Sequence, residues 1–115
     1  MLELILNHDG IDDEPLQRIQ RVLFKQVLLQ LDGIEPRELD RYYYTNGSQG
    51  VAIEIDTDEG DAFGSIYITV SNENPPEAES YAFALAHVFA RELGLKVINP
   101  LEGKVYDINS LPTRF

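Results

Sequence analysis

The acidic run from Asp56 to Asp61 contains the residue types that bind calcium ions. An EF-hand loop needs glycine at its sixth position and a bidentate glutamate at its twelfth. A loop of that kind starting at Asp56 would place Asp61 and Tyr67 at those positions, so the register is wrong. The run also joins two predicted strands, whereas an EF-hand loop joins two helices. We interpret it as a charged hairpin loop, with weak, non-specific cation binding as the alternative, and we expect no metal and no cofactor.

A second candidate for metal binding is the segment from His8 to Glu14, which offers one imidazole and several carboxylates. Metal sites require side chains that converge on one point, and neighbouring residues of a loop rarely do so. Acidic residues are also favoured where a helix begins, because they interact favourably with its dipole. We therefore predict that Asp12 or Asp13 caps a helix and that the segment binds no metal.

Signatures of catalysis are weak along the whole chain. Cysteine is absent, and His87 lies in an apolar helical segment. No glycine-rich phosphate-binding loop occurs. No serine has the context of a nucleophile elbow; the serines are Ser48, Ser65, Ser71, Ser80 and Ser110. We predict that the protein is not an enzyme, with a small acid–base enzyme that uses His87 or the acidic cluster as an alternative.

Charge is the strongest signal in the composition. Nine basic residues against 20 acidic ones give a net charge of −11. A chain this acidic is repelled by phosphate backbones and by anionic lipid, so we expect neither nucleic acid nor membrane as a partner. A length of 115 residues with 43% hydrophobic residues predicts one domain, 1–115. The chain lacks the basic start of a signal peptide and any apolar run that could cross a bilayer, so we expect a cytoplasmic protein.

The acidic residues are unevenly distributed. From Tyr42 to Ala90 there is no Lys or Arg. Strand alternation places the acidic residues of 51–56 and the polar residues of 64–71 on the sheet face away from the helices. Carboxylates beside tyrosines suit a basic protein partner, because carboxylates pair with Lys or Arg and tyrosine supplies rigid contact area. The predicted partner-binding residues are Tyr43, Glu54, Asp56, Asp58, Glu59, Asp61, Tyr67 and Thr69.

These residues are positioned by a predicted α+β fold of order β-α-β-β-β-α-β-β, with two helices on one face of a mostly antiparallel sheet. Strands are predicted at 2–6, 41–45, 51–56, 64–71, 96–98 and 104–107, and helices from 12 or 13 to 31 and from 74 to 94. Asn46-Gly47 predicts a hairpin turn, and Gly94 predicts the end of the second helix. Strand alternation places Tyr43 on one face and Tyr42 and Tyr44 on the other, but it does not determine which of the two faces is exposed to solvent.

The stretch YAFALAHVFARELGLKVINPLEGKVYD, from Tyr81 to Asp107, resembles the C-terminal part of small acidic bacterial proteins. Several of these are immunity proteins of polymorphic or contact-dependent toxin systems. The resemblance implies an inhibitor that covers the cationic site of a basic toxin, such as a nuclease. These families share no catalytic motif, so no functional residue is carried over. The alternative binding function is that of a secretion-type chaperone for an effector protein, because such chaperones resemble this chain in size, acidity and mixed helix–strand order. The oligomeric state is not predicted.

Overall fold

The computed structural model describes residues 1–38, 40–45 and 50–106. Its main sheet has seven strands in the spatial order β3-β4-β5-β7-β1-β8-β9, and each neighbouring pair is antiparallel. The strands are β1 Leu2–Asn7, β3 Ile34–Pro36, β4 Arg41–Thr45, β5 Ala52–Thr57, β7 Ile66–Val70, β8 Lys96–Asn99 and β9 Lys104–Tyr106. Two short strands, β2 Ile19–Gln20 and β6 Ala62–Phe63, pair separately.

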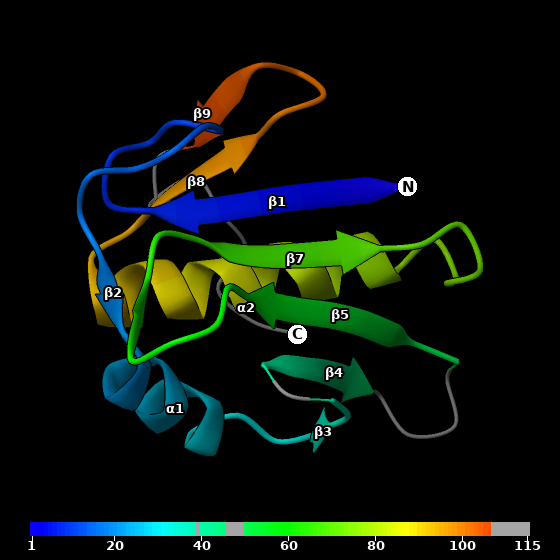
Figure 1. Ribbon diagram of the computed structural model, residues 1–115. Helices are drawn as coiled ribbons and strands as arrows, with labels where there is room; N and C mark the ends of the chain where they lie inside the picture. The colour runs from blue at the N-terminus through cyan, green and yellow to red at the C-terminus, as the bar shows by residue number, and fades with distance from the viewer. Residues whose placement is uncertain (39, 46–49, 107–115) are drawn as a thin grey trace.

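Helix α2 Ala78–Leu93 lies across one face of this sheet, and α1 Arg21–Leu29 packs against α2 near the β3–β4 edge (Figure 1). The predicted α+β class and arrangement are therefore confirmed. The structure adds β2, β3 and β6 to the predicted strands. The predicted Asn46-Gly47 turn and Asp107 lie outside the described residues.

Alternation along the central strands divides the sheet into an apolar and a polar face. Ile53 and Ile55 of β5 are fully buried, as are Ile66 and Ile68 of β7. They join one core with α2 and with Phe24 of α1, whose ring lies 5.5 Å from that of Phe89 and 5.5 Å from that of Phe63. Burial of this apolar surface is the main stabilising contribution, and it fixes which side chains of each strand remain on the other face.

Helix α2 ends as predicted and begins later than predicted. Gly94 has a left-handed φ of 69°, and the N–H of Leu95 donates to the carbonyl oxygen of Ala90 at 3.0 Å, which is the pattern of a Schellman stop. The prediction that the helix begins at Asn74 is wrong. The Asn74 side chain instead accepts a hydrogen bond from the N–H of Ala52 at 2.7 Å, so it holds the start of β5 rather than the start of the helix.

The prediction that the first helix begins at Asp12 or Asp13 is also wrong, because α1 starts at Arg21. Residues 19–20 pair with β6 and are unavailable to the helix. Leu16, whose helical spacing with Ile19 and Leu23 predicts a place in the core, is 91% exposed. The segment before β2 is held by Asp9, whose Oδ2 accepts the N–H of Leu16 at 2.6 Å. Tertiary pairing has overridden a weak helical preference here.

Neither helix of the described ranges is long and apolar enough to span a bilayer.

Candidate protein-binding face

The antiparallel register brings five of the predicted residues together on the sheet face opposite the helices. Tyr43 of β4 pairs with Glu54 of β5, and Glu54 pairs with Thr69 of β7. In the next row, Asp56 pairs with Tyr67. All five side chains are half-buried. We call this set the polar face; within the described residues, no helix or strand lies over it (Figure 1).

The register also settles the orientation of the three tyrosines. Tyr44 is buried in the core, and Tyr42 packs against the core with its ring 6.0 Å from that of Phe24. Tyr43 lies on the polar face, where its hydroxyl donates to Glu54 Oε1 at 3.1 Å. Its neighbours Ala52, Glu54, Thr69 and Ser71 line a small hollow of about 120 Å³ beside it.

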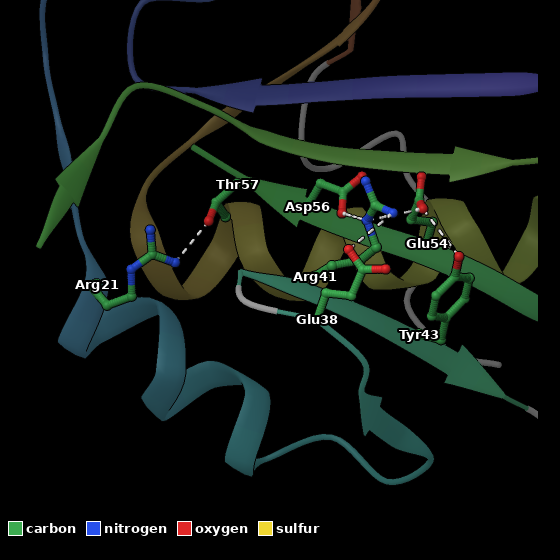
Figure 2. A network of polar contacts seen from close by, with 7 residues as sticks. All are labelled: Arg21, Glu38, Arg41, Tyr43, Glu54, Asp56 and Thr57. Atoms are coloured by element: carbon green, nitrogen blue, oxygen red, sulfur yellow. Dashed lines mark hydrogen bonds and ion pairs between the residues drawn. The ribbon is translucent and has the colours of Figure 1, made fainter. Parts of the chain in front are cut away.

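The polar face contains one cation that the sequence interpretation missed. Arg41 pairs with Asp56 across the two strands. Its Nε lies 3.0 Å from Asp56 Oδ1 and 3.3 Å from Glu54 Oε1, and its Nη1 lies 3.9 Å from Glu38 Oε2 (Figure 2). The signal was present in the sequence, since Arg41 immediately precedes the span without Lys or Arg and starts the strand opposite Asp56. The acidic pair on the face is therefore partly neutralised.

Crowding of carboxylates perturbs the protonation of this face. The pKa of Asp56 is raised, first by burial and then by its contact with Glu54, and Arg41 only partly opposes the rise. The hydrogen bond to Glu54 raises the pKa of the Tyr43 hydroxyl. The pKa of Arg41 is raised by its hydrogen bond and charge interaction with Asp56. These directions favour the protonated forms of Asp56 and Tyr43 and the charged form of Arg41.

A second arginine lies at the edge of the same face. Arg37 follows β3, and its Nη2 lies 3.2 Å from Glu35 Oε2. Its guanidinium carbon is 5.2 Å from the centre of the Tyr43 ring, which is within the range of a cation–π contact. Two arginines of this chain thus contact the side chains that were predicted to receive a basic partner.

The other three predicted residues lie elsewhere. Asp58, Glu59 and Asp61 are exposed in the connection between β5 and β6, at the end of the sheet rather than on its face. The connection is anchored by Arg21, whose Nε donates to the Gly60 carbonyl oxygen at 2.8 Å and whose Nη2 donates to the Asp58 carbonyl oxygen. These hydrogen bonds fix the backbone of the connection, and the side chains of Asp58, Glu59 and Asp61 remain exposed to solvent.

The helical spacing of Arg18, Arg21 and Lys25 predicts a solvated basic face on the first helix, and Arg21 contradicts that prediction. Its side chain is buried, with 9% exposure for the residue. Its Nη1 donates to Thr57 Oγ1 at 2.7 Å and lies 3.1 Å from Asp40 Oδ1. The guanidinium carbon is 4.5 Å from the centre of the Phe63 ring. Arg21 is therefore a structural residue that connects α1 to the β5–β6 connection.

A cavity of about 560 Å³ adjoins the polar face at Tyr67. Its charged and polar lining comes from two loops and the start of β7: Asp12, Asp13, Glu14, Arg18, Asp58, Ser65 and Tyr67. Burial and the nearby charge of Asp58 raise the pKa of Tyr67. The sequence pattern predicts that Asp12 or Asp13 caps a helix. Because α1 starts only at Arg21, both residues lie in a loop instead, where they line the same cavity as Asp58. The acidic surface is therefore larger than predicted.

The described residues contain no group of three or more His, Cys, Asp or Glu side chains placed to hold a metal ion. His87 is buried in α2, away from the polar face. The chemistry that the face can perform is ion pairing and hydrogen bonding with a cationic surface. Comparison with known proteins gave no match: no family model, no curated protein and no solved structure is significantly similar to the chain.

Proposed function

We propose that the protein is an acidic binding module that neutralises a basic protein toxin, in the manner of an immunity protein. One observation carries the proposal: acidic side chains and tyrosines form a continuous surface from the polar face, through Tyr67, to the cavity lined by Asp12, Asp13 and Asp58. Such a surface imitates the charge of a nucleic acid. It would compete for the cationic active site of a nuclease and would accelerate association through long-range attraction.

The distribution of charge along the chain supports binding of a basic partner through the acidic surface rather than through α1. Residues 15–31 contain no acidic residue, although the whole chain carries 20. The exposed surface of α1 carries Lys25 and apolar side chains, whereas the polar face, its adjoining loops and α2 carry carboxylates. The α1 region is therefore the part of the surface that attracts a basic partner least, which biases the encounter away from it.

Affinity capture with matched charge reversals tests the proposal. The tagged protein would be used as bait in its native cells, with elution by stepwise salt. A double variant, Glu54→Lys with Asp56→Lys, changes the polar face. The control, Glu77→Lys with Glu79→Lys, makes the same change of charge at exposed positions at the start of α2. We expect a basic partner with the wild type and the control, and loss of that partner with the face variant. Equal capture by both variants would contradict a role for this face.

The chaperone alternative is favoured by one separate observation. An apolar groove of about 510 Å³ lies between α1 and β3, lined by Lys25, Leu28, Leu29, Leu31, Ile34, Pro36 and Tyr42. Leu29 is 87% exposed, and a secretion chaperone binds its client through an apolar surface of this kind. Leu29→Asp would then abolish capture of a partner that the polar-face variant retains. The opposite pattern supports the immunity function.

A further inference from the structure

Arg41 shows which cation the polar face accepts. Its guanidinium group is shared between two carboxylates, with Nε 3.0 Å from Asp56 and 3.3 Å from Glu54 (Figure 2). Cross-strand pairing fixes both carboxylates on a rigid sheet, and the Tyr43 hydroxyl orients Glu54 through a hydrogen bond. The face therefore holds a planar cation in a defined place before any partner arrives, and preorganisation of this kind lowers the cost of binding.

The contact made by Arg41 is exchangeable. Its side chain is 43% exposed, so it can swing into solvent without leaving a buried cavity. Exposed ion pairs contribute little to stability, so their replacement by an equivalent pair costs little. Arg21 provides the contrast within the same chain, because it is buried and all three of its guanidinium nitrogens are hydrogen-bonded. Of these two arginines, only Arg41 has the exposure that exchange requires.

We propose that an arginine of the basic partner replaces Arg41 on Glu54 and Asp56, so that Arg41 is an internal competitor that sets the affinity of the polar face. This inference rests on the proposed function and names the chemistry of the partner. A guanidinium group is favoured over the ammonium group of lysine, because its donors point in fixed directions, as those of Arg41 do with Nε toward Glu54 and Asp56 and Nη1 toward Glu38, whereas an ammonium group acts as a point charge. The hollow beside Tyr43 and Glu54 gives room for neighbouring atoms of the incoming side chain.

Binding of short labelled peptides tests the replacement without the natural partner. Fluorescence anisotropy would compare a hexa-arginine and a hexa-lysine peptide on the wild type, on Arg41→Gln and on Arg91→Gln. Arg91 is exposed on α2, so the control makes the same change of charge away from the polar face. We expect Arg41→Gln to bind hexa-arginine roughly two- to fivefold more tightly than Arg91→Gln does, the range that corresponds to removal of an exposed ion pair. The gain for hexa-lysine should be smaller.

Two further variants make the outcome decisive. Addition of Glu54→Gln and Asp56→Asn to Arg41→Gln should abolish the gain, because the receiving carboxylates are then neutral. Arg41→Lys, which keeps the charge and fold, should give an intermediate affinity for hexa-arginine. Equal affinities for Arg41→Gln and Arg91→Gln, or a gain that survives loss of both carboxylates, would overturn the inference. Failure to capture a toxin would refute the proposed function and leave the peptide result intact, so the two failures are distinguishable.

Discussion

Replacement of Arg21 by methionine should destabilise the protein more than any other change of a single charged side chain that touches the β5–β6 connection. Methionine retains most of the aliphatic length and can still pack against Phe63. It removes three hydrogen bonds, to Gly60 O, Thr57 Oγ1 and Asp58 O, together with the ion pair to Asp40. The acceptors on the loop lose their charged donor, and Asp40, with only 15% of its side chain exposed, loses its counter-ion.

The size of the stability loss in Arg21→Met follows from the burial of the ion pair rather than from the number of contacts removed. Removal of one partner of a buried ion pair costs about 3–5 kcal/mol, since an uncompensated charge remains. A single hydrogen bond contributes about 0.5–1.5 kcal/mol, so Thr57→Val, which removes only one acceptor, should cost that much. We expect Arg21→Met to lose about 3–5 kcal/mol, a large share of the roughly 5–15 kcal/mol that stabilises a typical domain.

Urea unfolding followed by circular dichroism would measure these differences, provided that the slope of free energy against denaturant is unchanged. Arg21→Lys is the matched control, because it keeps the charge but cannot direct three donors to Gly60, Thr57 and Asp58 at once. It should recover only part of the loss. A cost below about 1 kcal/mol for Arg21→Met, the range of exposed pairs, would refute the reasoning, as would full recovery with lysine.

Three further predictions concern the loops and the polar face. Gly33→Ala should cost well over the roughly 1–2 kcal/mol of a left-handed residue, because its Cβ would lie 2.6 Å from a backbone oxygen, whereas Gly94→Ala, with open space, should cost only that amount; thermal unfolding compares them. Asn7→Ala should cost about 2–4 kcal/mol by urea unfolding, since fully buried Asn7 donates hydrogen bonds to Ile11 O and Ser65 Oγ. The folded-state pKa of Asp56 lies above the ordinary 3.8, so its contribution to stability is complete below pH 3.8 and is lost as the pH rises through the raised pKa. The free energy of unfolding of Asp56→Asn relative to wild type should therefore increase between pH 3.8 and the raised pKa and then stay constant. A difference between the two proteins that does not change with pH would contradict the raised pKa.

Much of the fold was predictable because strong local patterns agreed with tertiary packing. The alternation of Ile53 and Ile55 with Glu54 and Asp56 fixed which face of β5 is buried, and Gly94 fixed the end of α2. The start of α1 was not predictable from spacing, because the pairing of β2 with β6 is a long-range interaction that no local period reveals.

The candidate site was predictable to the same extent. Parity placed Tyr67 and Thr69 beside Glu54 and Asp56, since these residues lie on strands with clear alternation. The contact of Arg41 with Asp56 depends on the exact register of two strands, and the cavity beside Tyr67 depends on loops from distant parts of the chain. Both features depend on contacts between residues that are far apart in the sequence, so no periodic pattern predicts them.

The central position of β1 has a consequence for how the chain is made. β1 lies between β7 and β8, so neither of its neighbours exists until the ribosome has passed residue 66 and then residue 96. At about 5–20 residues per second, the strand waits for about 3–12 seconds before its first partner is synthesised. During that interval Leu2, Leu4 and Leu6, which are buried in the finished sheet, are exposed on an unpaired strand. Until β7 is synthesised, the apolar face of β1 is therefore available for non-native contacts, and we expect slower translation to lengthen that exposure.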